Sequence, residues 1–367
     1  MQARGRDVVS LMRGEPDFQT PAHISDALVA ALGKGRTRYP DNRGEPTLRA
    51  AVALKLSRDN GIVYDPGAEI LITTGATLGL YAALTALLDE GDEVLLPDPV
   101  YDAYQSPIRL AGGVVRPVRA AIEGDRFVLT AQALEAAITP RTRVLLLNTP
   151  WNPAGTVFDE SELSAIADVV VRHDLTLVSD EIYEAIVYDG HRHVSPARLS
   201  ADIRARTIVV NSLSKTYAMT GWRLGYCAGP AGVIGRMFLV LQQSSRGPAT
   251  FIQDAGVVAL TGPQDAVAGM RNEYAARRGQ VLGAFAALPR VRALPPEGGF
   301  FAMLDVREIG IPSNEIRRRL LDDAGVAVVH GAAYGPGGEG TLRVSFGSGG
   351  DALTEGLRRL REGLLVL

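Results

Sequence analysis

The sequence has one cysteine, no long apolar run and almost no excess charge of either sign. Cys227 has no second cysteine to pair with, so no disulfide can form within the chain, which favours a reducing compartment. Charge or glycine interrupts the most apolar stretches within about ten residues, whereas a membrane span needs about 20. The formal net charge is −3 and both signs are mixed along the chain, so we expect no broad basic surface for nucleic acid or anionic lipid.

The N-terminal stretch MQARGRDVVSLM also lacks the apolar segment of a secretory signal peptide. These absences predict a cytoplasmic protein that binds neither nucleic acid nor membrane. A length of 367 residues exceeds one average core and indicates two domains. Hydrophobic residues make up 46% and charged residues 22%, as in ordinary globular proteins.

Short apolar runs along the first two thirds of the chain have the composition of buried β-strands. Residues 77–88 and 160–172, which lie between such runs, repeat apolar residues at helical spacing. This alternation predicts a mainly parallel α/β sheet, which binds ligands at the carboxyl ends of its strands. The runs are EILIT from Glu69, DEVLLP from Asp92, RVLLLN from Arg143, TLVSD from Thr176, TIVVN from Thr207 and RLGYCAG from Arg223.

The pattern changes from about Pro263 onward. A charged helical stretch, residues 271–288, leads to the apolar runs FFAML, VAVVH and TLRVSF, and an amphipathic helix follows from Asp351. These elements predict a smaller α+β domain. No long linker separates it from the sheet, so we expect the two parts to share a cleft that holds the active site.

The segment NSLSKTYAMTGWRLGY carries the densest group of reactive side chains. Ser212, Ser214 and Lys215 follow the apolar run TIVVN, and Arg223 lies eight residues beyond the lysine. Two hydroxyls and a guanidinium can bind a phosphate, and a lysine among cations and away from water becomes a nucleophile. A phosphate-bearing aldehyde would suit both functions. On spacing alone, a surface turn with a solvated lysine fits equally well.

The segment VSDEIY ends an apolar strand with a carboxylate. Asp180 is expected at the carboxyl edge of the sheet, partly removed from water, where it needs a cationic partner. A pyridinium nitrogen is one such partner, and Tyr183 could reach the ring hydroxyl from the same side. A helix N-cap is an equally good interpretation of Asp180, and Glu181 is interpreted as structural.

Three further motifs are consistent with a cofactor site, although each also has an ordinary structural explanation. In TTGATLGLYAAL, Gly75 precedes a helix, so the amides of Ala76 and Thr77 could bind an anion, or the glycine could simply form a turn. In NTPWNPAGTVF, Asn152 lies in a rigid turn that could aim it into the cleft. In PDPVYDAY, Tyr101 could stack on a flat cofactor or belong to the core.

Arg343 alternates with apolar neighbours in TLRVSF and should therefore point to the opposite face of its strand. There it could bind a substrate carboxylate through two hydrogen bonds, or form a salt bridge within the smaller domain. His191 and His193 flank Arg192 in a polar loop without acidic or cysteine ligands at metal spacing, so we expect no metal site.

Taken in order, eight segments resemble the pyridoxal-phosphate-dependent aminotransferases of the aspartate aminotransferase family, class I/II, fold type I. The resemblance covers nearly the whole chain and implies a seven-stranded large domain, residues 36–264. It also implies a small α+β domain formed by residues 1–35 and 265–367. The segments are GEPDF, RYPDNRGEPTLRAAV, TTGAT, PDPVYDAY, NTPWNPAGTVF, VSDEIY, SLSKTYAMTGWRLGY and LRVSFG.

The resemblance implies a role for each matching residue at the cofactor. Lys215 corresponds to the lysine that holds pyridoxal phosphate as a Schiff base and then moves the proton, and Asp180 to the partner of the pyridine nitrogen. Tyr101 corresponds to the stacking aromatic. Asn152 and Tyr183 correspond to the residues on the ring oxygen, and Gly75, Ala76, Thr77, Ser212, Ser214 and Arg223 to the phosphate cup.

The resemblance also implies how substrate and partner are bound. Arg343, assisted by Gly14 and Asn152, corresponds to the site of the substrate α-carboxylate. Tyr39 corresponds to a tyrosine that reaches the phosphate of the neighbouring subunit, which implies a homodimer with shared active sites. The implied reaction is a ping-pong transfer from an L-amino acid, aspartate, glutamate or a related one, to a 2-oxo acid.

Two departures and two alternatives accompany this interpretation. Only thirteen residues precede Gly14, so we expect reduced dimer contacts or site closure by an N-terminal arm. Ala76 stands where the family often has a polar residue in the phosphate loop. The same cofactor could instead serve a β-eliminating lyase, or a regulatory protein without turnover. Arg246 could meet an acidic substrate side chain in the cleft or across the dimer, or it could form an ion pair or a contact on the phosphate side.

Overall fold

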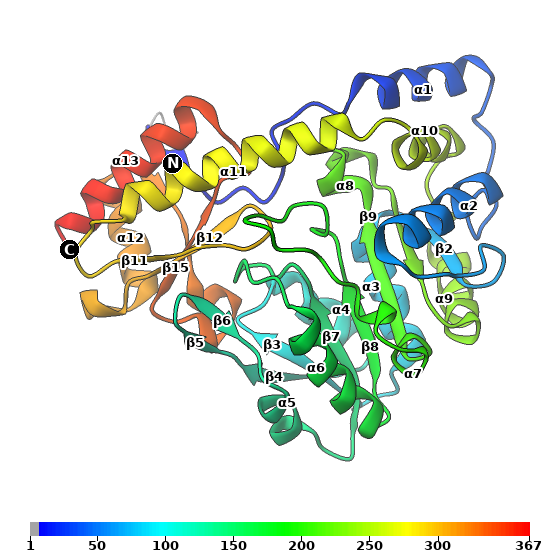
Figure 1. The fold of residues 1–367 in the computed structure, drawn as a ribbon, viewed down its shortest axis with the longest axis horizontal. Coiled ribbons are helices and arrows are strands. Elements are labelled where there is room, and N and C mark those ends of the chain that lie inside the picture. Colours follow the sequence, from blue (N-terminus) through cyan, green and yellow to red (C-terminus); the bar gives the residue numbers. More distant parts are fainter. Residues whose placement is uncertain (1–6) are drawn as a thin grey trace.

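A computed structural model describes residues 7–367, and a seven-stranded sheet dominates it (Figure 1). The strand order is β2-β10-β9-β8-β7-β3-β4. All neighbouring strands run parallel except β10, which is antiparallel to both of its neighbours, so the predicted mainly parallel sheet is confirmed. The strands are β2 (Ile70–Thr73), β3 (Glu93–Asp98), β4 (Val114–Arg119), β7 (Thr142–Asn148), β8 (Thr176–Asp180), β9 (Thr207–Ser212) and β10 (Gly225–Ala228).

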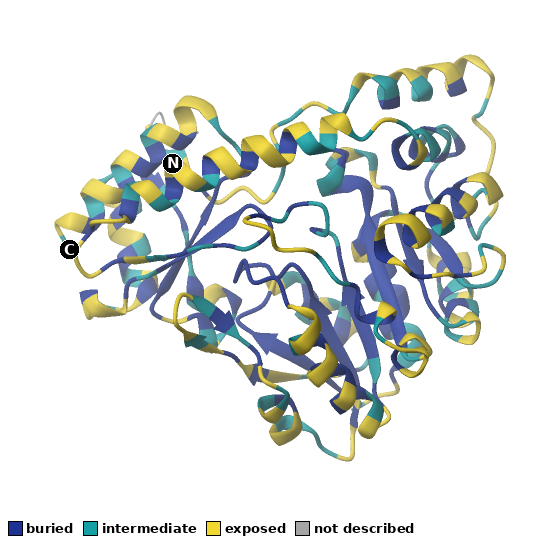
Figure 2. Cartoon of the chain, in the orientation of Figure 1, coloured by how far each residue is buried: buried dark blue, intermediate teal, exposed yellow. Residues whose placement is uncertain are grey.

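Helices cover both faces of this sheet, which explains why its strands are continuous apolar runs. Alternate residues of one strand enter different cores: Val144 and Leu146 of β7 pack towards α3 and α9, whereas Leu145 packs towards α6. Figure 2 shows the strands buried between helices whose outer sides are exposed. The covering helices are α2 (Pro46–Lys55), α3 (Gly75–Leu87), α4 (Gln105–Leu110), α5 (Ala131–Ala137), α6 (Glu160–Arg172), α7 (Ala201–Arg204), α9 (Ala231–Ser244) and α10 (Thr250–Thr261).

The smaller part contains an antiparallel sheet of four strands in the order β11-β12-β15-β14. It lies beside the helices α11 (Asp265–Phe285), α12 (Ser313–Asp323) and α13 (Gly350–Leu365). Its strands are β11 (Arg292–Leu294), β12 (Phe301–Asp305), β14 (Val329–His330) and β15 (Thr341–Ser345).

The N-terminal segment joins this smaller part. Strand β1 (Val9–Ser10) pairs in parallel with β13 (Val326–Ala327), whereas β14 pairs with β15. The predicted single strand VAVVH is therefore wrong, because its two halves bond to different partners. Helix α1 (Ala22–Gly33) crosses to the other side of the molecule and packs against α10.

Two remaining features complete the fold. Strand β4 was not predicted because Arg116, Pro117 and Arg119 interrupt its apolar pattern, as is usual at a sheet edge. Strands β5 (Ala121–Glu123) and β6 (Arg126–Val128) form a separate hairpin.

Within residues 7–367, no helix combines the length and apolarity needed to cross a membrane. Residues 1–6, which belong to the predicted small domain and N-terminal stretch, lie outside the described residues.

Candidate active site

A cavity of about 550 Å³ opens at the carboxyl edge of the seven-stranded sheet. The N-terminal segment around Gly14 and strand β15 contribute the opposite wall, so both parts of the chain line it. The cavity brings together most of the predicted site residues: Gly14, Ala76, Thr77, Tyr101, Asn152, Asp180, Tyr183, Ser212, Ser214, Lys215, Arg223 and Arg343.

Lys215 lies in the short helix α8 (Leu213–Thr216), directly after β9. Its Nζ donates a hydrogen bond of 2.7 Å to the carbonyl oxygen of Gly14. Burial, reinforced by Arg223 and Arg343, lowers the pKa of Lys215 to about 8, although Glu15 acts in the opposite direction. A larger fraction of neutral amine is therefore present near neutral pH than in an ordinary lysine, as a nucleophile requires.

Asp180 ends β8 and is buried at the base of the cavity. Its carboxylate accepts a hydrogen bond of 2.7 Å from the hydroxyl of Tyr104 and one of 3.2 Å from the backbone N–H of Ile182. Burial raises the pKa of Asp180 to about 6, while the bond from Tyr104 lowers it. No helix follows Asp180, so the N-cap interpretation is wrong. Sequence reasoning missed Tyr104, which lies three residues beyond Tyr101 in the same motif.

The start of α3 forms a cradle with Arg223. Gly75 has a φ of +77°, and a Cβ at this position would lie 2.6 Å from Nη2 of Arg223. The amides of Ala76 and Thr77 belong to the first helical turn, where no intrahelical carbonyl can accept them. Free amides beside a guanidinium suit an anion such as a phosphate group.

Arg343 is a buried cation, with 6% of its surface exposed. It donates a hydrogen bond of 3.2 Å to Oδ1 of Asn152 and one of 2.9 Å to the carbonyl oxygen of Met12. Its guanidinium also lies over the rings of Phe301 and Tyr334. Its buried Nε has no hydrogen-bond partner, and no carboxylate pairs with it in the described part of the chain. The predicted alternative, a salt bridge in the smaller domain, is wrong. The guanidinium of Arg343 can therefore donate to a carboxylate that enters the cavity.

Aromatic and amide side chains complete the walls. The backbone N–H of Asn152 donates a hydrogen bond of 2.7 Å to Oδ1 of Asn148, which fixes the position of Asn152. Tyr183 packs edge-on against Phe300, with ring centres 5.5 Å apart. Tyr101 is half-exposed at the cavity and meets the ring of Tyr104 edge-on.

Tyr39 does not join this cavity. Its side chain is 83% exposed, and the guanidinium of Arg246 lies 5.1 Å from its ring centre. Neither residue lines the cavity of its own chain. Gly75 does not line it either, but its lack of a side chain leaves room for the guanidinium of Arg223.

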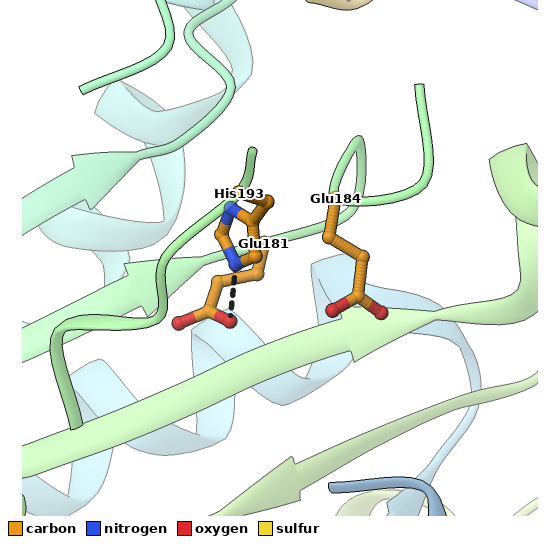
Figure 3. Close-up of side chains that lie close together, drawn as sticks. All are labelled: Glu181, Glu184 and His193. Atoms are coloured by element: carbon orange, nitrogen blue, oxygen red, sulfur yellow. Dashed lines mark hydrogen bonds and ion pairs between the residues drawn. The ribbon is translucent and has the colours of Figure 1, made fainter. Parts of the chain in front are cut away.

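A second polar cluster, of Glu181, Glu184 and His193, lies outside the cavity (Figure 3). Potential metal-ligand atoms of the three residues lie within 4.8 Å of one another, so the fold brings two carboxylates to His193 that the sequence spacing did not indicate. Protein groups already bond all four carboxylate oxygens: Lys55, Asn60 and Asn211 bond Glu184, and Ser179, Ser195 and His193 bond Glu181. We therefore interpret the cluster as a buried ion network, and the absence of a metal stays a prediction.

This network reaches the cavity through Asn211, a residue that the sequence reasoning left without a role. Its side-chain NH2 donates a hydrogen bond of 2.7 Å to the carboxylate of Glu184. Its Oδ1 accepts a hydrogen bond of 2.7 Å from the backbone N–H of Ser212. The hydroxyl of Ser212 in turn accepts 3.0 Å from the amide of Ser214. The buried ion pair therefore helps to fix the backbone that carries both serines and Lys215.

Lys55→Met should lower the free energy of unfolding by about 3–5 kcal/mol, because Glu184 would keep a buried charge without its cation. Urea unfolding followed by circular dichroism measures this change. Arg58→Met, which breaks an exposed pair with Asp59, is the control and should change stability by less than about 1 kcal/mol. An equally small loss for Lys55→Met would contradict the importance of the network.

An α/β sheet that carries a lysine of lowered pKa and an anion cradle at its carboxyl edge, facing a buried arginine of β15, has the arrangement of a pyridoxal-phosphate enzyme of fold type I. The family model for aminotransferase class I and II matches residues 6–360. The chain therefore belongs to the class I and II aminotransferases, enzymes that depend on pyridoxal phosphate and transfer amino groups from amino acids to 2-oxo acids.

Individual relatives are similar to this protein over almost the whole chain. Aspartate aminotransferase of Geobacillus stearothermophilus is 38% identical over 98% of this chain and 92% of its own. Aromatic-amino-acid aminotransferase 2 of Thermococcus litoralis is 40% identical over 97% and 91%. The structure of aspartate aminotransferase from Thermus thermophilus with maleate superposes with a TM-score of 0.93, at 39% identity and 99% and 93% coverage. Nothing in these comparisons favours the β-eliminating lyase.

The donor set of the cavity fits pyridoxal phosphate. The carboxylate of Asp180 is bonded only by uncharged donors, which leaves its charge available to a protonated ring nitrogen. The cradle of Gly75, Ala76, Thr77 and Arg223 suits the phosphate. Lys215 offers the amine that an aldehyde requires.

The cofactor-free protein should take up pyridoxal phosphate faster as the pH rises towards about 8. Only the neutral amine of Lys215 attacks an aldehyde, so the rate constant should rise about tenfold per pH unit below its pKa of about 8 and then level off. Stopped-flow absorbance between about pH 6 and pH 10 measures this rate. A rate constant that still rises tenfold between pH 9 and 10 would indicate that the pKa of Lys215 lies near the ordinary lysine value of 10.5.

Proposed function

We propose that this aminotransferase uses aspartate, glutamate or a related L-amino acid and the corresponding 2-oxo acids in a ping-pong reaction. The observation that carries the proposal is the buried guanidinium of Arg343, which shares a cavity with Lys215 and Asp180 and has no described carboxylate partner. A carboxylate common to all amino acids and 2-oxo acids would satisfy it. Relatives that are aspartate aminotransferases, one of them crystallised with maleate, support a dicarboxylic substrate.

In this proposal the residues at the reacting centre act directly on substrate and cofactor. Bound pyridoxal phosphate supplies an electron sink for the carbanion at the substrate α carbon. Lys215 would hold the cofactor through its Nζ, and the same amine, when not bound to the cofactor, would take the proton from the substrate α carbon. Asp180 keeps the ring nitrogen protonated, and Tyr104 holds the carboxylate of Asp180 in place.

The surrounding residues bind and orient. We assign the phosphate to Gly75, Ala76, Thr77, Ser212, Ser214 and Arg223, and the ring oxygen to Asn152 and Tyr183. Tyr101 covers the ring by stacking. Arg343 binds the substrate α-carboxylate with help from Asn152, to which it is already bonded, and from Gly14.

We further propose a cytoplasmic homodimer in which Tyr39 reaches the phosphate of the neighbouring subunit. Its 83% exposed ring, held under Arg246 outside its own cavity, supports a contact with a second chain. Analytical ultracentrifugation of Tyr39→Phe and Tyr39→Ala variants tests the assembly, and titration with pyridoxal phosphate tests their cofactor affinity.

We also propose the domain division into residues 36–264 and residues 1–35 with 265–367. The pairing of β1 with β13 supports the union of both chain ends in the smaller domain. Helix α1 packs on α10 and so contacts the larger domain.

A panel of amino donors and 2-oxo acceptors tests the proposed function. The holoenzyme should transfer amine from glutamate or aspartate, and each half-reaction should proceed alone, as a ping-pong mechanism requires. Release of ammonia and pyruvate from amino acids with a β leaving group, without transfer, would instead indicate a lyase. Cofactor binding without turnover of any donor would indicate a regulatory protein.

A further inference from the structure

We propose that Arg13 selects substrates with a second, distal carboxylate. This inference rests on the proposed function, because it takes the α-carboxylate to lie at Arg343. It assigns a substrate class to one side chain that lines the cavity.

The backbone of the N-terminal segment places Arg13 between the two reactive cations. The carbonyl of Met12 accepts 2.9 Å from Arg343, and the carbonyl of Gly14 accepts 2.7 Å from Lys215. The carbonyl of Arg13 itself accepts 2.5 Å from the hydroxyl of Ser345. The carbonyls on either side of Arg13 are therefore bonded to side chains of the cavity, and residues 12 and 14 of an extended chain lie only about 7 Å apart. The side chain of Arg13 consequently starts beside the space that the substrate would fill.

The charges that line the cavity leave one cation without a role in the reaction. The basic side chains there are Arg13, Lys215, Arg223 and Arg343. Cofactor and α-carboxylate take the last three in the proposed function. Arg13 remains for a further anion, and a guanidinium binds a carboxylate through two parallel hydrogen bonds.

Arg13 forms an ion pair with Glu15 that a substrate could readily replace. The side chain of Arg13 is 70% exposed and that of Glu15 is 34% exposed, and a pair this open to water is weak. Glu15 keeps a second contact when Arg13 leaves, because the hydroxyl of Thr220 lies 3.4 Å from its Oε2. An uncharged substrate leaves the pair intact. One cavity can thus serve the two different amino acids of a ping-pong cycle.

Glutamate and glutamine provide the matched test, since they differ in the distal charge and hardly in shape. We measure kcat/KM of the holoenzyme for both amino acids in the first half-reaction. Arg13→Ala should lower the ratio of glutamate to glutamine about 2- to 5-fold, the effect of losing a charge pair that stays open to water. Arg13→Lys should keep part of the ratio. Glu15→Gln, which removes the competing carboxylate, should raise it a few-fold.

The controls separate the possible outcomes. Arg246→Ala should leave the ratio of glutamate to glutamine unchanged. Arg343→Gln should lower kcat/KM for both amino acids by a similar factor. An unchanged ratio in Arg13→Ala, or a ratio lost in Arg246→Ala, would overturn the inference while the proposed function stands. A wild type that transfers no amine from any donor would overturn the proposed function first. The cofactor absorbance of each variant confirms that it folds.

Discussion

Lys215→Ala should abolish amino transfer, with kcat at least about 10⁴-fold below the wild type. The variant loses both the covalent anchor of the cofactor and the amine that moves the α proton, and proton transfer alone commonly contributes 10²- to 10⁴-fold. The imine absorbance of the holoenzyme should disappear as well. Steady-state rates and a visible spectrum of the purified variant measure both effects.

The scarcity of lysine makes this prediction unusually sharp. The chain contains three lysines, Lys34, Lys55 and Lys215, and Lys55 is buried in its pair with Glu184. Borohydride reduction followed by peptide mass spectrometry should find the cofactor on Lys215 alone. Lys34→Ala, at an exposed site, is the matched control and should retain rate and spectrum. Reduced cofactor on Lys34 or Lys55 would disprove the assignment.

Asp180→Asn should retain the cofactor but lower kcat about 10²- to 10³-fold, the range observed when one preorganised electrostatic group is removed from an active site. The amide is isosteric with the carboxylate but carries no negative charge, so the ring nitrogen loses the partner that keeps it protonated. The expected result is an intact imine spectrum together with slow loss of the α proton, measured by exchange of deuterium into the amino acid.

A neighbouring carboxylate provides the control for Asp180→Asn. Asp102 lies in the η3 turn (Asp102–Tyr104) between Tyr101 and Tyr104, and its side chain is exposed. Asp102→Asn should change kcat by less than about twofold, because a solvated charge at this position is screened. If Asp180→Asn behaves like Asp102→Asn, the carboxylate of Asp180 has no part in the reaction.

The sequence predicted the central strands and the cavity because their signals are local. Strands β7, β8 and β9 are buried on both faces, so each appears as an unbroken apolar run followed by a polar residue at the sheet edge. The alternation around Arg343 likewise indicated the face to which it points. Asp180, Lys215 and Arg343 are therefore found in one cavity as predicted.

Other features depend on contacts that no local pattern records. The bond from Tyr104 to Asp180 joins residues 76 positions apart, and the pair of Lys55 and Glu184 joins residues 129 apart. Both follow from the packing of distant elements and not from spacing. The proposed role of Tyr39 came from the family resemblance alone, because a contact with a second subunit leaves no pattern in the sequence around it.

The contacts of the N-terminal segment have a consequence for the diversification of this enzyme. Met12, Arg13 and Gly14 bind Arg343, Ser345 and Lys215 through backbone carbonyls, which every amino acid possesses. A substitution at residue 13 can therefore change the chemistry offered to a substrate without removing a hydrogen bond that supports catalysis. If Arg13 selects the substrate as proposed, single substitutions at residue 13 can therefore alter substrate preference while the backbone contacts to the reacting centre are preserved.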